Sequence, residues 1–252
     1  MSSSIERDVN ADGVWSHRDQ PENSQTLRLE GARIFLDRWQ AGFSAPLITR
    51  ERYGQKSSGL ADLQLMLGYE ALPDWDYNPY RPKAVIFTSV LVPTGKSTFE
   101  ADDNYGLDSR GQGFWALGVG ALLTKGFRKW DFNTSVEAHR SFSKRVSKNG
   151  FDGTLIPGWG GTATLGAGYN ENNLRLGFSL ASTYEDPIRA EGNLNSDGAI
   201  KRWTTTSLLV SYRLDEDWAC TGAFSDQSWL GSPSNTSLSQ SASVLLQKKW
   251  SR

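Results

Sequence analysis

The sequence predicts an all-β fold, an up-and-down antiparallel transmembrane β-barrel of about twelve strands. Three observations point to this fold class. Apolar residues recur at every second position through most of the chain from residue 26 onward, which is the period of a strand and not of a helix. The connections between these segments alternate between long and short, and aromatic residues gather at the segment ends. No stretch carries a helical pattern with proper caps.

Composition excludes several other classes. The 252 residues include 27 basic and 28 acidic side chains, so a formal net charge of −1 offers no basic surface for nucleic acid. Cys220 is the single cysteine and can form neither an internal disulfide nor a multi-cysteine zinc site. No apolar run reaches the ~18 residues of a membrane-spanning helix. The mean hydropathy of −0.49 fits a barrel, because only alternate strand residues would face lipid.

The alternation is clearest at residues 130–142. There Trp130, Phe132 and Val136 alternate with Asp131 and Glu137, so one face is apolar and the other can line water. The same pattern fills residues 61–69 and 174–181. Softer alternation marks 42–53, 111–125, 160–169, 201–214, 217–226 and 238–250, while 26–39 and 82–93 are strand-like without a clean face. Most segments span roughly 10–14 residues, which suits a tilted membrane-crossing strand better than a strand of a soluble protein.

Loop lengths and aromatic positions support the same architecture. After 82–93 the connections are long (94–110), short (126–129), long (143–159), short (170–173), long (185–200), short (215–216) and long (227–237). Outer-membrane barrels alternate in this way, with the long loops outside. Aromatic girdles at the two bilayer interfaces would explain the residues near segment boundaries, which are Trp39, Tyr53, Tyr69, Trp130, Tyr169, Tyr184, Trp203, Tyr212, Trp218 and Trp250.

The N-terminal part divides the chain into a polar segment, 1–25, and a barrel, 26–252. Eleven strands are visible, whereas a bacterial single-chain barrel normally has an even number. We therefore expect one more strand, either a weak one at residues 13–18 or one upstream. Residues 1–25 carry no signal-peptide pattern, which leaves two alternatives open: a cytosolic protein, or a bacterial outer-membrane protein in its mature or shortened form.

If the apolar faces meet lipid, the polar faces line a lumen. The lumen-lining candidates, which carry both signs of charge, are Asp62, Gln64, Asp131, Asn133, Glu137, His139, Arg175 and Arg213, with Thr205, Ser207, Gln247 and Lys249. Such a mixture does not indicate the strong ion selectivity of a single-sign ring. We expect no catalytic residues, no cofactor and no metal. Twelve strands lie between a filled barrel and a wide pore, so the path should be narrow or partly occluded.

Catalytic, phosphate-binding and metal-binding alternatives are weaker. His139 and Ser141 share one strand face, as in some lipid-hydrolysing barrels, but that face should point to the lumen. The Gly95-Lys96-Ser97 run lacks the rest of a phosphate-binding loop. The acidic residues near 100–108, Glu100, Asp102, Asp103 and Asp108, lack calcium-loop spacing and are better interpreted as a solvated loop. Cys220 is expected to pack as a small apolar side chain.

Residues 42–96 resemble a known family. The run 59–70 (GLADLQLMLGYE) is similar to the Gly-x-Gly-Asp-Leu-x-Leu-x-x-x-Tyr strand of the outer-membrane family labelled for the meta-pathway of phenol degradation. The preceding strand and the Val92-Pro93-Thr94-Gly95-Lys96 strand end also match, although Ala61 replaces a glycine. The resemblance implies an outer-membrane barrel that helps hydrophobic or aromatic compounds to enter, and it implies no catalytic residue.

The sequence therefore predicts a monomeric outer-membrane channel or passive transporter for small, hydrophobic or aromatic molecules. Its expected partners are the lipid bilayer and the solute, not nucleic acid. Capture by Tyr105 and Trp229 in the long loops would precede passage along the lumen or a lateral exit between strands. The alternatives are a structural or adhesive barrel with an occluded lumen, a lipid-acting phospholipase-like barrel enzyme, and a soluble lipocalin-like barrel.

Overall fold

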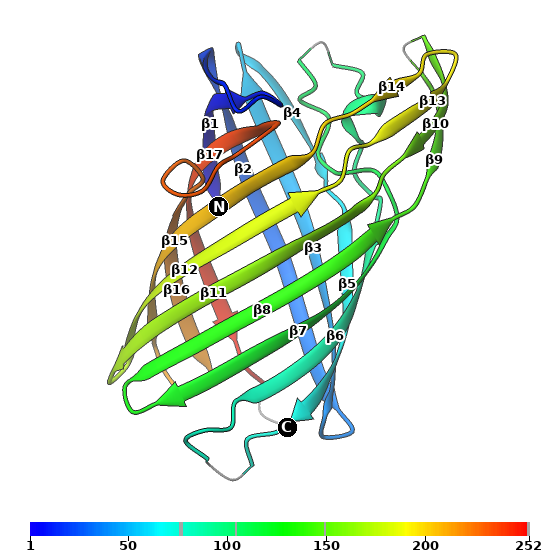
Figure 1. The fold of residues 1–252 in the computed structure, drawn as a ribbon. Coiled ribbons are helices and arrows are strands. Elements are labelled where there is room, and N and C mark those ends of the chain that lie inside the picture. The colour runs from blue at the N-terminus through cyan, green and yellow to red at the C-terminus, as the bar shows by residue number, and fades with distance from the viewer. Residues whose placement is uncertain (76–77, 104, 149, 251–252) are drawn as a thin grey trace.

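The chain forms a closed antiparallel β-barrel with almost no helix, as predicted (Figure 1). This computed structural model describes residues 1–75, 78–103, 105–148 and 150–250. The wall contains twelve strands. In chain order they are β1 (Ser2–Val9), β2 (Trp15–Phe35), β3 (Trp39–Arg52), β5 (Leu63–Leu72), β6 (Lys83–Val92), β7 (Ala116–Phe127), β8 (Trp130–Ser141), β11 (Trp159–Glu171), β12 (Leu174–Glu185), β15 (Lys201–Arg213), β16 (Trp218–Asp226) and β17 (Thr236–Lys248).

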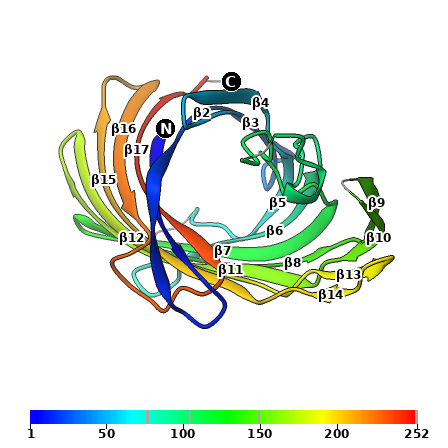
Figure 2. The ribbon, with the colours of Figure 1, turned by 90° about the horizontal axis from the view of Figure 1, so that it is seen from above.

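Each wall strand pairs with its neighbours in the order of the chain, so the topology is up-and-down. The ring closes through β1, which pairs with β17 on one side and β2 on the other (Figure 2). Closure satisfies the backbone hydrogen bonds that an open sheet would leave at its edges. The twelfth strand therefore lies at Ser2–Val9, while residues 15–18 of the proposed 13–18 segment begin β2.

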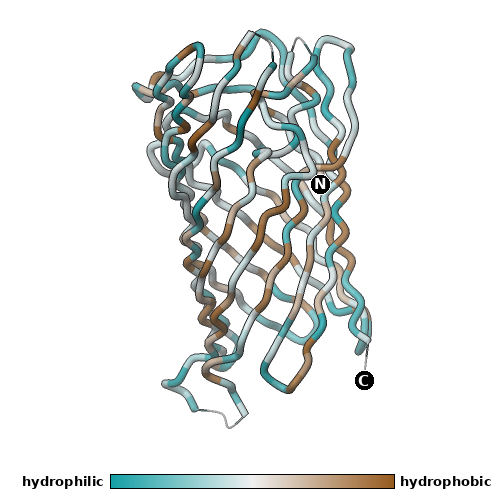
Figure 3. The backbone as a smooth tube through the Cα atoms, turned by 90° about the vertical axis from the view of Figure 1, so that its right-hand side faces the viewer, coloured by the Kyte–Doolittle hydropathy of each residue, from teal (hydrophilic) through white to brown (hydrophobic). Residues whose placement is uncertain are grey.

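The side chains alternate between the outside and the inside of the wall. The outward set is apolar and exposed, with Phe132 and Val136 on β8 and Leu176 and Phe178 on β12 each between 42% and 55% exposed. Figure 3 shows hydrophobic positions interleaved with hydrophilic ones along the wall, and hydrophilic loops above it. This interleaving is the period-two pattern that identified the strands.

One irregularity reverses the alternation between β4 (Gln55–Leu60) and β5, which follow each other along β3. Leu60 faces Leu47 and Gln64 faces Ser44, so four residues advance on one strand while three advance on the other. The extra residue makes a bulge at 61–62, where the backbone leaves the ladder. Leu60 and Leu65 consequently both face outward although they lie five positions apart, and Asp62 turns inward.

The two ends of the barrel differ. At one end, tight turns such as 36–38 and 172–173 use left-handed residues, with φ of 59° at Asp37 and 51° at Asn172. We call this the short-turn end. At the other, the long-loop end, the chain builds η1 (Thr98–Glu100) and a second sheet of β9 (Lys144–Lys148), β10 (Phe151–Ile156), β13 (Arg189–Gly192) and β14 (Ser196–Asp197). No helix in the described residues is long and apolar enough to cross a membrane.

Aromatic side chains pair at the short-turn end, where the rings of Trp39 and Tyr69 lie 5.0 Å apart and those of Trp130 and Tyr169 lie 5.2 Å apart. Trp203 differs from this pattern, since it occupies the inward register of β15 together with Thr205 and Ser207.

The predicted strand 111–125 begins too early. Residues 111–115 belong to the connection between β6 and β7, and the strand starts at Ala116. Their backbone is held by Asp62 instead of by a neighbouring strand, which explains why an alternating sequence does not extend the ladder here.

Candidate functional site

The inward face of β8 carries a column of polar side chains along the barrel. Asp131 lies next to the short-turn end, Asn133 follows, and Glu137 and His139 lie toward the long-loop end. Their neighbours on β7 and β11 include several glycines, at 118, 120, 126, 160, 166 and 168. Small residues opposite large polar ones leave room for those side chains inside the wall.

Asp131 and Arg175 form a bidentate ion pair in the column. Arg175 donates to both carboxylate oxygens, with Nε–Oδ2 at 2.8 Å and Nη2–Oδ1 at 2.6 Å. Asn170 adds a third hydrogen bond to Asp131 at 2.7 Å. The pair spans Gly168, where any side chain would come within 2.6 Å of both partners. Two lumen-lining candidates therefore neutralise each other near the short-turn end.

Two further carboxylates lie toward the long-loop end. Glu137 accepts a hydrogen bond from the Ser89 hydroxyl at 2.6 Å, and His139 Nε2 lies 3.2 Å from the Glu185 carboxylate. Gly118 lies against Ser89 and Glu137, and Gly160 lies against His139 and Glu185. This wall of the lumen is therefore acidic, with two carboxylates and one imidazole.

Asp62 holds a loop in place. Its carboxylate accepts backbone hydrogen bonds from Gly95 at 3.0 Å, Gln112 at 2.6 Å and Gly113 at 3.2 Å. These amides lie at the two ends of the β6–β7 connection, residues 93–115, which we call the anchored loop. It lies at the long-loop rim beside β5, as Figure 2 shows. Three charge-assisted hydrogen bonds to a residue that is only 9% exposed fix the loop firmly.

Lysines tie the other side of the anchored loop. Asp102 is bonded by Lys148 and Lys96, with Nζ–O distances of 2.5 Å and 2.7 Å, and these contacts lower the pKa of Asp102 from 3.8 to about 2. Lys144 pairs with Glu100 at 2.7 Å. Three of the acidic residues considered for Ca²⁺, Glu100, Asp102 and Asp108, therefore bind lysine ammonium groups. No three His, Cys, Asp or Glu in the described ranges group as a metal would require.

The remaining lumen-lining candidates are spread out. Gln64 lies on the inward register of β5 opposite Ser44. Arg213 lies on the inward register of β15, exposed at the short-turn end. Asn133 lies against Gly166 in the middle of the wall.

Sequence reasoning missed an arginine group on the opposite wall. Arg50 and Arg52 come from β3, Arg18 comes from β2, and Arg110 comes from the anchored loop. The alternation in 42–53, with Leu47 and Thr49 on the other face, was the signal that could have placed Arg50 inside. Arg110 had no such signal, because a residue in a loop follows no strand alternation that would place its side chain inside or outside the barrel.

Apolar side chains also face the lumen. Phe87 lies over Gly120, and Leu209 faces Ala223 on the inward register. Met66 and Leu245, on the same register, are 42% and 47% exposed. The lumen is therefore mixed, with apolar surface between its charged groups.

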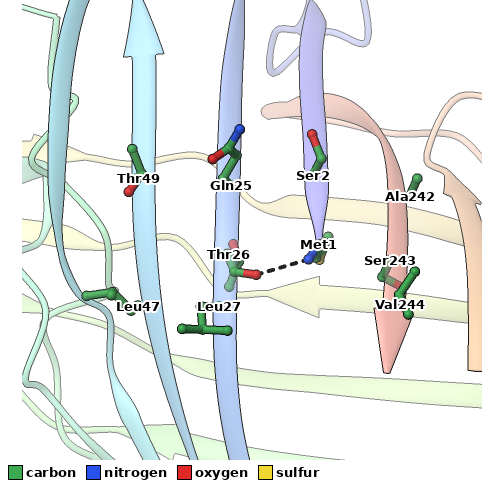
Figure 4. Close-up of a pocket in the computed structure, with 10 residues that line it drawn as sticks. All are labelled: Met1, Ser2, Gln25, Thr26, Leu27, Leu47, Thr49, Ala242, Ser243 and Val244. Carbon is green, nitrogen blue, oxygen red and sulfur yellow. Dashed lines mark hydrogen bonds between the residues drawn. The ribbon is translucent and has the colours of Figure 1, made fainter. Parts of the chain in front are cut away.

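A recess of about 510 Å³ opens in the wall beside Met1 (Figure 4). It lies where β2 and β17 diverge beyond the pairs Ser2–Gln25 and Ser2–Ala242. Leu27, Leu47 and Val244 contribute apolar lining, and the Met1 ammonium donates to the Thr26 carbonyl at 3.0 Å. The lateral exit between strands stays a prediction.

Other candidates lie as follows. Ser141 is 5% exposed, and its predicted partner His139 bonds with Glu185. Tyr105 packs on Tyr53, with ring centroids 5.1 Å apart. Trp229 packs on Phe224, at 5.7 Å, against the outer face of β16. Cys220 occupies the outward register between Tyr212 and Leu246.

Comparison with solved structures gives a clear similarity in fold. No protein-family model and no curated protein matches the chain. Among solved structures, the crystal structure of the COG4313 outer membrane channel from Pseudomonas putida F1 is similar, with a TM-score of 0.73 and 16% sequence identity. The match covers 97% of this chain and 91% of that chain. At this identity, the similarity shows that the two chains share the barrel fold.

Proposed function

We propose that this protein is a bacterial outer-membrane channel that passes small molecules by diffusion. One observation carries the proposal: the barrel exposes apolar side chains over its outside and places polar and charged ones inside. A soluble barrel has the reverse arrangement, because water surrounds it and its interior forms the core. The similar structure from Pseudomonas putida F1 is an outer membrane channel, which supports the same role.

The solute class we propose is small and hydrophobic or aromatic. Support comes from the apolar side chains among the lumen residues, especially Phe87, Met66 and Leu245. Polar solutes would find hydrogen-bond partners along β8, so the lumen suits molecules with one apolar part and one polar part. The resemblance of residues 42–96 to the meta-pathway family agrees with such a solute. We propose a monomer embedded in lipid, with the long loops outside the cell.

Flux through reconstituted protein tests this function. Purified protein folded in liposomes should swell them in isosmotic solutions of small polar and aromatic solutes, faster than empty liposomes. Boiled protein, reconstituted in the same way, is the control for leakage. No flux of any solute through verified folded barrels would favour an occluded structural barrel and contradict the proposal.

A lipid-acting enzyme is the rival that deserves a direct assay. Hydrolysis of phospholipid by the folded protein, lost in Ser141→Ala, would support that function and count against a simple channel. We expect no difference between the two proteins, because Ser141 is buried on the inward side and His139 is bonded to Glu185.

A further inference from the structure

The inner wall of β2 and β3 carries a concentrated positive charge near the long-loop end. Four guanidinium groups belong to it, those of Arg18, Arg50, Arg52 and Arg110, and we call them the arginine cluster. Arg18 and Arg110 both lie close enough to Arg50 to act on it electrostatically. Arg52 is two positions from Arg50 on the same face of β3, and it acts electrostatically on Asp8. The carboxylates that contact them are Asp8 and Glu22.

Arg18 forms ion pairs with both of these carboxylates. Its Nε and Nη2 reach the two oxygens of Asp8 at 2.6 Å and 2.8 Å, and its Nη1 reaches Glu22 at 2.9 Å. A hydrogen bond from Nη2 to the Ser237 hydroxyl, at 3.0 Å, completes its set. Arg18 is therefore fully paired and 14% exposed, which is typical of a structural ion pair.

The other three arginines are poorly paired. Arg50 lies 3.7 Å from Glu22, too far for a strong hydrogen bond. Arg110 donates from Nη1 to the Ser57 hydroxyl at 2.7 Å, and its guanidinium lies against Gly59. Among the described residues, Arg52 and Arg110 form no ion pair, and the Nε of each is buried without a hydrogen-bond partner.

Such groups are costly unless something binds them. A buried N–H without a partner loses its hydration, and a charged one loses more. An oxyanion can accept two parallel hydrogen bonds from one guanidinium, so it would satisfy the open N–H groups and the excess charge together.

Aromatic surface borders the cluster. The Arg52 guanidinium lies 5.1 Å from the centroid of the Tyr53 ring, and Tyr53 is paired in turn with Tyr105. A flat apolar face beside a set of guanidinium groups matches a planar ring that carries an anionic substituent.

We propose that Arg50, Arg52 and Arg110 form a binding site for the carboxylate of a small aromatic acid. The site lies on the long-loop side, where a solute enters, and it deepens the proposed channel function on which it rests. Gly59 is part of the site, because only a residue without a side chain lets the Arg110 guanidinium lie on β4. Neutral aromatic compounds would lack the anionic contact.

Calorimetry on the folded protein in detergent tests the site without transport. Benzoate and neutral benzyl alcohol have the same ring, so their difference isolates the charge; micelles without protein give the blank. We expect benzoate to bind at least about tenfold more tightly, the factor that about 1.4 kcal/mol represents. Equal binding of the two, or no binding of benzoate, would overturn the proposal. Inorganic phosphate binding as tightly as benzoate would overturn the assignment to a carboxylate.

Two arginine variants test which residues bind benzoate. Arg110→Gln and Arg50→Gln should each weaken benzoate binding by about tenfold, because each removes a guanidinium from the anion. Arg145→Gln, on β9 and 77% exposed, removes the same charge elsewhere and should leave binding unchanged. Arg110 lies in a loop, so its variant keeps the test valid if the β3 variant does not fold. Unchanged binding in both folded variants would contradict the site.

The failure of this site and the failure of the channel can be told apart. Liposomes that pass neutral solutes but show no benzoate binding would reject the arginine site alone. Liposomes that pass nothing, made with protein that binds benzoate, would reject the channel and leave the site standing.

Discussion

Asp131 and Arg175 lie two strands apart and meet across Gly168, joined by hydrogen bonds of 2.8 Å and 2.6 Å. The glycine on β11 is what lets β8 and β12 share an ion pair inside the wall. Both charged partners are 29% exposed, so the pair is partly shielded from water.

Gly168→Val should break this contact. The new side chain would occupy the space of the guanidinium and the carboxylate, and overpacking of this kind costs about 1–3 kcal/mol. The measurement is urea unfolding of the barrel in micelles, followed by tryptophan fluorescence. Gly222→Val is the matched control, because a Cβ at Gly222 meets nothing within 4 Å. An equal loss of unfolding free energy in the two variants would show that the change from glycine to valine in a strand, and not the broken ion pair, causes the destabilisation.

Asp62→Ala should release the anchored loop. Three backbone N–H groups would lose their acceptor, and unpaired buried amides favour a loop that moves to reach water. Trypsin should then cut the folded protein after Lys96 and Arg110, while the wild-type loop resists. Asp152→Ala, which removes an exposed carboxylate from β10, should give the wild-type pattern; a cleaved wild-type loop would contradict the anchoring role.

Acid should loosen the same loop through Asp102. Lys148 and then Lys96 hold the pKa of Asp102 at about 2, below its usual 3.8. A lowered carboxyl pKa contributes stability above the unfolded value, and this contribution disappears as the pH falls from about 4 to 2. Single-channel recordings with acid on the long-loop side should show added current noise in that window. Asp102→Asn should show the noise already at neutral pH. If this variant kept the wild-type pH response, the acid-induced noise would come from a group other than Asp102.

Charged substitutions at two adjacent positions of β8 can test which face of the strand contacts lipid. Val136→Arg places a charge on the outward side, which costs about 2–4 kcal/mol near the bilayer midplane. Ser135→Arg places the same charge in the lumen and should insert and fold nearly as well as wild type. The yield of folded barrel in liposomes, from the shift of unheated samples on gels, measures both. Equal yields would mean that lipid does not contact this face.

The wall of the barrel was predictable because burial repeats with the strand period. The strands predicted at residues 130–142 and 174–181 are present, because Phe132, Val136 and Leu176 alternate there with polar side chains. The first strand, Ser2–Val9, was not located, because SSSIERDV is almost entirely polar and short. Its place in the wall comes from pairing with β2 and β17, which a local pattern does not report.

Contacts between side chains inside the lumen depend on the register in which neighbouring strands pair, and the sequence alone does not determine that register. Asp131 and Arg175 could both be placed on inward faces, yet their meeting requires β11 to lie between their strands in one register. Asp62 was predicted as a lumen residue, but the bulge beside it and the returning loop turn it into an anchor. The small sheet of β9, β10, β13 and β14 was missed because its strands are short and interrupt long polar connections.

That small sheet has its own core, formed by Phe114, Val146 and Leu155, and it projects past the rim of the barrel. Its β13–β14 tip is exposed, with Leu194 at 64%, while Asn193 bonds back to β10 and braces the tip from below. A peptide epitope inserted at Leu194 would stand clear of the wall on a rigid stem. With the orientation proposed above, an antibody could then count folded barrels on living cells without entering the pore.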